Sequence, residues 1–292
     1  TPSHVLFDHI QKTGGMSLHA VLQSLFGSDR CSPILTGSVD EACAEFARYR
    51  CVTSHLYFHP QADLRDAWLL TVLRDPVERA LSYLAYLRYE VPASGSADAQ
   101  RARSLDLASD IDSADPQTLQ LLSNTMVAHF APLAWNGSDT LDDTRSLALA
   151  KEALRRFDLV GLTERMDETV DLLCHALGAR APASIPRINV TSRRIDVQAL
   201  PGAARERLRR LNALDAELYA YARVLHGNAR RRALFGPSPA ARAKDAPPVV
   251  APAATPAAAP APGADPKLPG PRDFGSRVAE VGRIDVSGVG GL

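Results

Sequence analysis

Several features that would point to a membrane, a nucleic acid or an oxidising compartment are scarce or missing in this chain. Its 33 Lys and Arg residues balance 33 Asp and Glu residues, so the formal net charge is zero and no overall field attracts nucleic acid. No apolar run approaches the ~20 residues that a membrane-spanning helix needs, and no secretory signal peptide is visible. We therefore expect a cytoplasmic protein without an integral membrane segment, whose association with any membrane goes through a partner.

Cysteine is also scarce, and its spacing gives no sign of a metal site. The four cysteines show neither C-x-x-C spacing nor a metal-ligand pattern with histidine. They are Cys31, Cys43, Cys51 and Cys174. We expect all four to be reduced and the protein to need no metal.

The composition changes near residue 236. Up to that point it is typical of a globular domain, and 292 residues suffice for one substantial core. Residues 237–271 are dominated by Pro and Ala and read as an extended linker. Residues 272–292 alternate apolar and polar side chains like a single strand. Since one strand has nothing to pair with, they predict the start of a further β module.

Within residues 1–236, apolar strand-like runs alternate with helical periodicity. Strands are expected near 4–10, 50–55, 68–73 and 158–162, and helices near 15–26, 76–90, 115–130, 143–157, 167–178 and 201–226. This alternation predicts an α/β, P-loop-like three-layer fold, with a central parallel sheet flanked by helices and ligands at its carboxyl edge. Residues 92–114 are small and polar, and we expect them to form a flexible loop near the substrate cleft.

The first strand runs directly into a segment with the character of a phosphate-binding loop. This segment is Lys12, Thr13, Gly14, Gly15, Met16 and Ser17. The glycines allow the backbone to approach an anion at the positive end of the following helix. The lysine precedes the glycines, whereas in the common ATP and GTP loop it follows them. Taken alone, the segment could also be an ordinary Gly-Gly turn beside a solvated lysine.

A second strand-to-helix junction follows the run Ala67–Leu73. It reads Arg74-Asp-Pro-Val-Glu-Arg-Ala-Leu-Ser82. Asp75 is a plausible N-cap, with Pro at the first helical position and Glu78 completing a capping box. Capping alone could explain this junction, but Arg74 and Ser82 also supply the planar fork and the hydroxyl that suit a phosphate. We interpret Arg79 as a structural residue or a charge on the helix surface.

Together the two junctions resemble the cofactor site of carbohydrate sulfotransferases that use 3′-phosphoadenosine 5′-phosphosulfate (PAPS). The family includes the heparan and dermatan/uronyl 2-O-sulfotransferases and many bacterial relatives, and the likeness covers about residues 4–226. The first junction is similar to the 5′-phosphosulfate loop P-K-T-G-G-T-S, with Gln11 and Met16 in place of Pro and Thr. The resemblance implies that residues 12–17 bind the 5′ end of PAPS and that Arg74 and Ser82 bind its 3′-phosphate. It also implies that Asn189, Val190 and Thr191 form a loop that closes over the cofactor.

Two histidines lie after the predicted strand near 50–55. His55 occupies the place of the catalytic histidine in the family's G-H-x-x-F segment, although Ser54 replaces the glycine. Histidine suits a general base because its unperturbed pKa, ~6.5, lies near working pH. His59 is the second choice, and His9 is expected to pack beside the site. A histidine at a strand end can also be merely a local hydrogen-bonding residue.

One family feature is missing. Relatives often carry N-x-x-T-R on a helix in mid-chain, but the segment Ser123–His129 lacks the Thr-Arg pair and retains only Asn124. This departure implies altered acceptor binding or reduced activity.

The resemblance implies a sulfotransferase that moves a sulfuryl group from PAPS to a hydroxyl of a carbohydrate acceptor. The acceptor would be a glycan, a polysaccharide or a glycolipid head group, with His55 as base and Lys12 stabilising the leaving phosphate. One alternative is a non-catalytic glycan-binding or scaffold module with a relict nucleotide site. Another is a P-loop kinase, which is disfavoured because no acidic Mg²⁺ ligand follows a strand in the expected context. The acceptor sugar, the hydroxyl sulfated and the oligomeric state do not follow from the sequence.

Overall fold

A five-stranded sheet forms the centre of the domain. The computed structural model describes residues 2–37, 39–56, 64, 67–92, 94, 96–108, 116–131, 143–188 and 193–236. Its strands are β1 (His4–Asp8), β2 (Cys31–Gly37), β3 (Cys51–Leu56), β4 (Ala67–Leu73) and β5 (Leu159–Leu162). They lie in the order β2-β3-β1-β4-β5, and every neighbouring pair is parallel. The expected linker, residues 237–271, and the expected β module, residues 272–292, lie outside the described residues.

Helices connect and cover the strands. They are α1 (Gly15–Phe26), α2 (Val39–Ala44), α3 (Pro76–Tyr89), α4 (Ala97–Ser104), α5 (Pro116–Leu122), α6 (Thr125–Phe130), α7 (Asp143–Arg155), α8 (Met166–Leu177), α9 (Gly202–Leu211) and α10 (Ala213–Phe235). Short 3-10 turns occur at η1 (Ser28–Arg30), η2 (Glu45–Ala47), η4 (Thr163–Arg165) and η5 (Val197–Ala199). None of these helices is both long enough and apolar enough to cross a bilayer, within the residues described.

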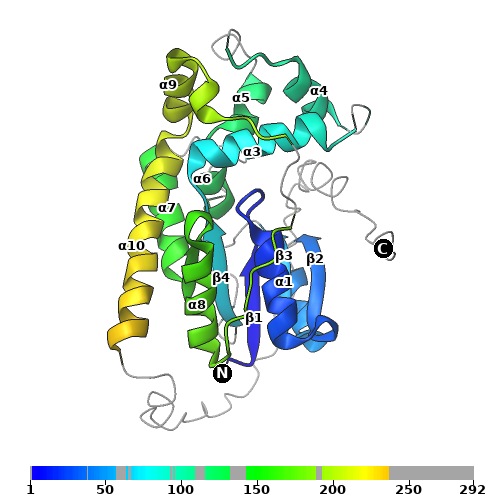
Figure 1. Cartoon of the computed structure of the whole chain (residues 1–292), viewed down its shortest axis with the longest axis vertical. Coiled ribbons are helices and arrows are strands. Elements are labelled where there is room, and N and C mark those ends of the chain that lie inside the picture. Colours follow the sequence, from blue (N-terminus) through cyan, green and yellow to red (C-terminus); the bar gives the residue numbers. More distant parts are fainter. Residues whose placement is uncertain are drawn as a thin grey trace, which may run out of the picture. The chain divides into compact units, whose positions relative to one another are not determined.

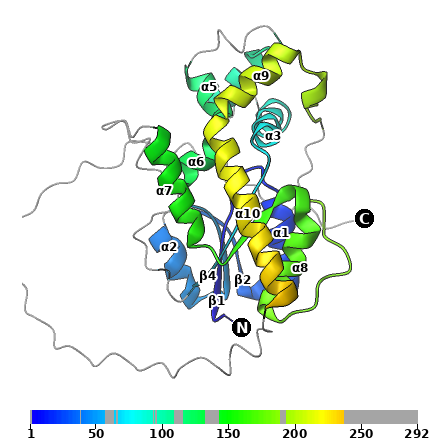
Figure 2. The same ribbon diagram turned by 90° about the vertical axis from the view of Figure 1, so that its left-hand side faces the viewer.

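The two faces of the sheet bury separate apolar cores. On one face, side chains such as Leu6, Val52 and Leu73 pack with α2, α6, α7 and α10. On the other, side chains such as Phe7 and Val72 pack with α1 and α8. Figure 2 shows the two helical layers on either side of the strands. The three-layer α/β fold predicted from the sequence is therefore confirmed.

A third core lies at the carboxyl ends of the strands. It is formed by apolar residues of α3, α4, α5 and α9, and Figure 1 shows these helices grouped together beyond the sheet. The expectation of a flexible loop over residues 92–114 is wrong at its centre, because α4 buries Ala99 and Ala102 against this core. Leu105 and Leu107 are buried there as well.

One strand was missed and two expected helices are corrected. The edge strand β2 was not anticipated from the sequence. The helix expected over 115–130 is interrupted before α6, where Asn124 adopts a left-handed conformation with φ 44°. The helix expected over 201–226 is broken at Asn212, and its second part continues to Phe235.

Both interruptions are explained by one set of hydrogen bonds between α6 and α10. The Asp215 carboxylate accepts the N–H groups of Met126 and Val127 at 3.0 and 2.7 Å. In return, the Asn124 side-chain oxygen accepts the N–H of Asp215 at 3.1 Å. Each helix thus satisfies open N–H groups at the start of the other, which an uninterrupted helix could not do.

Candidate functional site

The loop after β1 has the backbone conformation of an anion-binding turn. Lys12 and Gly14 have left-handed φ values of 66° and 81°, and the Thr13 hydroxyl donates to the Ile10 carbonyl at 2.8 Å. α1 begins at Gly15, and its N-cap, Gly14, makes no side-chain hydrogen bond. No side chain of the N-cap residue thus occupies the positive end of α1, where an anion could bind. Lysine in a left-handed conformation is uncommon and is often found at functional sites.

Gly15 is required by its contact with His9. A β-carbon at this position would lie 1.9 Å from His9 Cδ2 and 2.1 Å from His9 Nε2. The His9 side chain is buried, and its Nδ1 is without a hydrogen-bond partner in the part of the chain that the structure describes. The absence of a side chain at residue 15 thus lets an imidazole lie directly beneath the loop.

Lys12 and Arg74 lie together at the ends of the adjacent strands β1 and β4. The Arg74 guanidinium donates to the Lys12 carbonyl at 3.3 Å and pairs with Glu78 at 3.3 Å. The Lys12 ammonium lies 4.6 Å from the centre of the Tyr86 ring. Burial, and next the positive charge of Arg74, lower the pKa of Lys12. A bound anion would relieve this repulsion, so the pair has the character of a phosphate site.

Ser82 belongs to the same face of α3 as the residues that contact this pair. Glu78 contacts Arg74 and Tyr86 lies under Lys12, and Ser82 stands four residues from each of them along the helix. Residues four apart share a helix face, so Ser82 lies between the contacts to Arg74 and Lys12.

The junction at α3 is capped, but not by a reciprocal capping box. The Asp75 carboxylate accepts the N–H of Glu78 at 3.0 Å, as expected. The Glu78 side chain pairs with Arg74, and the N–H of Asp75 donates to Glu164 at 2.8 Å. Arg79 is not a surface charge: its side chain is buried and donates to the Thr125 hydroxyl at 2.9 Å.

Thr163, which the sequence did not single out, ties the two loops together. Its hydroxyl oxygen lies 2.6 Å from the Thr13 carbonyl oxygen and 3.1 Å from that of Leu73. Since Thr163 directly follows β5 and Leu73 ends β4, this one side chain links the ends of these two strands to the loop after β1. The only sequence signal for it was its place directly after an apolar strand.

His55 lies near the end of β3, on the other side of β1. Its Nδ1 lies 2.6 Å from the His9 carbonyl oxygen, which can only accept, so Nδ1 carries the hydrogen. In the neutral ring Nε2 then has a free lone pair. Burial lowers the pKa of His55, which favours the neutral form that a general base requires.

Two further buried histidines lie at the same edge of the sheet as His55. The His9 ring lies 4.4 Å from the His55 ring, centre to centre. The His129 Nε2–H donates to both carboxylate oxygens of Asp8, at 2.8 and 3.0 Å, and both residues are buried. In the sequence, residues 123–129 stood out only for the missing Thr-Arg pair, and neither His129 nor Asp8 was singled out.

The loop expected to close over a cofactor, Asn189, Val190 and Thr191, lies outside the described residues, as does His59. The residues on either side of this loop are described. The Ile188 N–H donates to the Ser17 hydroxyl oxygen at 3.1 Å, and the Arg193 guanidinium lies 5.5 Å from the centre of the Tyr89 ring. The chain therefore enters the segment beside α1 and leaves it beside α3.

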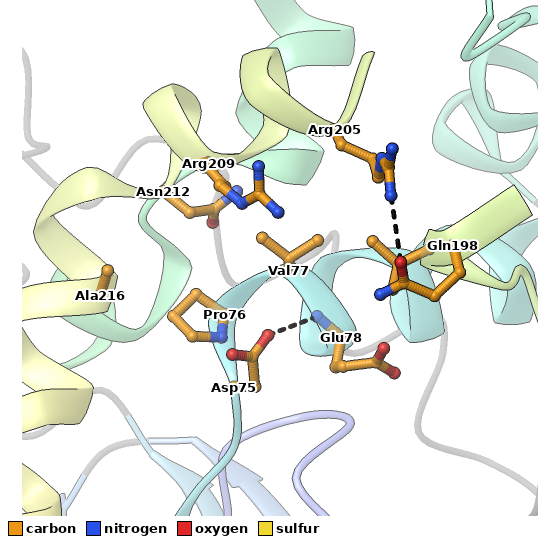
Figure 3. Close-up of a pocket in the computed structure, with 10 residues that line it drawn as sticks. Asp75, Pro76, Val77, Glu78, Gln198, Arg205, Arg209, Asn212 and Ala216 are labelled. Atoms are coloured by element: carbon orange, nitrogen blue, oxygen red, sulfur yellow. Dashed lines mark hydrogen bonds between the residues drawn. The ribbon is translucent and has the colours of Figure 1, made fainter. Parts of the chain in front are cut away.

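A cavity of about 500 Å³ adjoins Glu78. It lies between the start of α3, η5, α9 and α10, as Figure 3 shows. Its apolar wall is formed by Pro76, Val77 and Val197. It is also lined by Gln198 and Arg205, whose side chains are hydrogen-bonded to each other at 3.0 Å. The cavity thus combines apolar surface with amide and charged groups next to the residue that pairs with Arg74.

The described residues contain no group of three His, Cys, Asp or Glu side chains placed to hold a metal ion. The site instead offers cations, free helix N–H groups and a neutral imidazole. Such a set can bind a doubly phosphorylated ligand and remove a proton from a nearby hydroxyl.

A family model described as galactose-3-O-sulfotransferase matches residues 28–240, well over half of the chain. No curated protein matches the chain. The matched range contains His55, Arg74, Ser82 and His129, and it begins after the Lys12–Ser17 loop.

Proposed function

Since the chain belongs to the galactose-3-O-sulfotransferase family, we propose that it transfers a sulfuryl group from PAPS to a carbohydrate hydroxyl. The expectation of a carbohydrate sulfotransferase is confirmed at the level of the family. The narrower resemblance to bacterial 2-O-sulfotransferases stays a prediction. The observation that carries the proposal is the convergence of His55, Lys12 and Arg74 at the ends of three adjacent strands, β3, β1 and β4.

The residues at these strand ends fit the cofactor. When bound, PAPS supplies an activated sulfuryl group on its 5′-phosphate. Lys12 and the open N–H groups of α1 would hold the 5′ end, and Arg74 with Ser82 would hold the 3′-phosphate. Arg74 must then exchange its contact with Glu78 for the phosphate, which gains charge-assisted hydrogen bonds. The cavity beside Glu78 would receive the adenosine, because apolar walls and an amide suit a purine ring.

His55 would act on the acceptor. Its Nε2 would accept the proton of the sugar hydroxyl, and Lys12 would stabilise the negative charge left on the 5′-phosphate when the sulfuryl group is transferred from it to the hydroxyl oxygen. The Nδ1–H bond to the His9 carbonyl keeps the ring in the tautomer and orientation that this step needs.

The first experiment is thermal unfolding in the presence of adenosine 3′,5′-bisphosphate, ATP or 5′-AMP. A ligand at a hundred times its Kd adds ~2.7 kcal/mol to the stability of a protein whose folded state alone binds it. We expect stabilisation by the bisphosphate only, and its loss in Arg74→Ala. No stabilisation by the bisphosphate, or equal stabilisation by ATP, would contradict the assignment of PAPS as cofactor and favour a scaffold or a kinase.

The second experiment separates an enzyme from a glycan-binding module. His55→Ala should abolish transfer of ³⁵S-labelled sulfate from PAPS to galactose-containing glycans, while the response to the bisphosphate persists. If the wild-type protein binds a glycan and the bisphosphate but transfers nothing, the non-catalytic alternative is correct.

A further inference from the structure

The Lys12 ammonium lies over an aromatic ring rather than beside a carboxylate. It is 4.6 Å from the centre of the Tyr86 ring, and among the residues that the structure describes it forms neither an ion pair nor a hydrogen bond. The neighbouring cation differs, because Arg74 pairs with Glu78 at 3.3 Å. The two strand ends thus carry one cation that is paired with an acid and one that is held by a ring.

The Tyr86 ring is fixed by its surroundings. It is half-buried and packs against the core that α3 forms with α4, α5 and α9. The Tyr83 ring stacks beside it, with 6.4 Å between the centres and 26° between the planes. Its hydroxyl makes no hydrogen bond within the described part of the chain, so the ring alone makes the contact to Lys12. A rigid aromatic face is therefore presented to a flexible side chain.

A ring suits a lysine that has to bind phosphate. The face of the ring attracts the positive charge through its quadrupole. A carboxylate in the same place would neutralise the ammonium and occupy its N–H groups, whereas the ring leaves the charge in place and those donors open. Lysine also has a flexible four-carbon side chain. A partner that holds this side chain before a ligand arrives removes part of the entropy cost of binding.

The helix that supplies this ring also contacts the other cation. Glu78 and Tyr86 are two intervals of four residues apart on α3, so they share a helix face, and they contact Arg74 and Lys12 respectively. The Arg74 guanidinium in turn donates to the Lys12 carbonyl at 3.3 Å. The backbone of the loop and the lysine side chain are thus both held from the side of α3.

We propose that Tyr86 is a positioning residue that holds the Lys12 ammonium, charged and with its N–H groups open, where it binds the 5′-phosphate of the cofactor. The assignment rests on the proposed function, in which Lys12 binds the 5′ end of PAPS. Tyr86 acts through Lys12 and needs no contact of its own with the reacting atoms.

This role predicts a loss of affinity that depends on the 5′-phosphate. In Tyr86→Leu the Kd of adenosine 3′,5′-bisphosphate, measured by calorimetry, should rise about tenfold, because the freed lysine must be ordered on binding. The Kd of adenosine 3′-monophosphate, which has no 5′-phosphate, should stay the same. Tyr86→Phe keeps the ring and should bind both nucleotides as the wild type does.

The contact itself can be followed by NMR in the protein without ligand. The chain has only four lysines, so a sample labelled with ¹³C-lysine gives few signals, and Lys12→Arg identifies the signal of Lys12. The four are Lys12, Lys151, Lys244 and Lys267. Protons above the face of an aromatic ring are shielded by its ring current. The Lys12 signal should therefore move downfield in Tyr86→Leu and stay in place in Tyr86→Phe.

Tyr49→Leu is the matched control. The Tyr49 ring is also half-buried and also receives a cation, with the Arg48 guanidinium 5.7 Å from its centre. It precedes β3, whereas the loop of Lys12 follows β1, so in this parallel pair it lies at the opposite edge of the sheet. Its replacement should change neither the Lys12 signal nor the affinity for either nucleotide.

A weaker affinity for the bisphosphate alone, together with the downfield shift, supports the proposal. An equal rise of both Kd values would show that Tyr86 is merely structural. An unchanged or lower Kd of the bisphosphate would show that the ring does not help Lys12 to bind. If Tyr86→Leu does not fold, Tyr86→Met, which fills similar space without a ring, takes its place. A wild-type protein that binds neither nucleotide would instead overturn the proposed function, and this role with it.

Discussion

The imidazole of His9 lies where a side chain at Gly15 would have to be. A β-carbon on residue 15 would fall 1.9 Å from His9 Cδ2, far inside any real contact distance. Because the same imidazole lies 4.4 Å from the His55 ring, it connects the phosphate loop to the proposed base. A disturbance of the loop should therefore reach the base.

Gly15→Ala should push His9 out of place and lower transfer by about a hundredfold, the cost of an error of about 1 Å in a catalytic geometry. The substitution should cost less in a His9→Ala background, where there is no ring to displace. Transfer rates of the four proteins in this double-mutant cycle measure the coupling. Gly227→Ala is the control, since a β-carbon there meets nothing within 4 Å. Additive effects would show that His9 and Gly15 act independently.

The placement of adenosine in the cavity can be tested from α10. Ala216 is exposed and lines the cavity, so Ala216→Trp should fill part of it. We expect the Kd of adenosine 3′,5′-bisphosphate, measured by calorimetry, to rise about tenfold, a loss of about 1.4 kcal/mol. Ala220→Trp, one turn along the same helix and outside this cavity, should leave the Kd unchanged. Equal affinities in both variants would place the adenosine elsewhere.

The sequence predicted four of the five strands for a physical reason, and it placed candidate site residues at the ends of three of them. Buried parallel strands are continuous apolar runs, and a strand-to-helix turn that binds phosphate needs glycine, lysine and arginine at fixed places. β1, β3, β4 and β5 are marked in this way. β2 is not, because an edge strand with Ser32 and Pro33 resembles a turn in sequence.

Contacts between residues that are distant in sequence could not be predicted from local sequence patterns. The bond between His129 and Asp8 joins residues 121 apart. Local sequence shows only a histidine at the end of a short helix and an aspartate in a strand. Arg79 illustrates the same limit: an arginine on a helix usually faces water, yet here it is 1% exposed and lies under α6.

The exchange of caps between α6 and α10 should make Asp215 important for stability. Burial raises the pKa of Asp215, and its carboxylate nevertheless accepts two N–H groups of α6. Asp215→Ala would leave both donors unsatisfied, at about 1–3 kcal/mol each. Urea unfolding should show the loss, whereas Glu217→Gln, exposed on the same helix, should change stability by less than about 0.5 kcal/mol. A stability equal to that of the wild type would mean that other groups cap α6.

Stability should fall as the solution becomes acidic, and His9 should be a main cause. Burial, with smaller contributions led by the charge of His55, lowers the pKa of His9 well below its usual value. Below pH ~6.5 the unfolded chain therefore binds a proton at His9 that the folded protein does not bind. The contribution of His9 to the free energy of unfolding is therefore fully present above that pH and decreases as pH falls. His9→Phe should reduce the slope of unfolding free energy against pH by up to about 1.4 kcal/mol per pH unit in urea titrations between pH 5.5 and 7.5. Val21→Ala, a buried apolar change on α1, should lower the whole curve without altering its slope. Parallel curves for the wild type and His9→Phe would show that His9 takes up its proton in the folded protein as readily as in the unfolded chain.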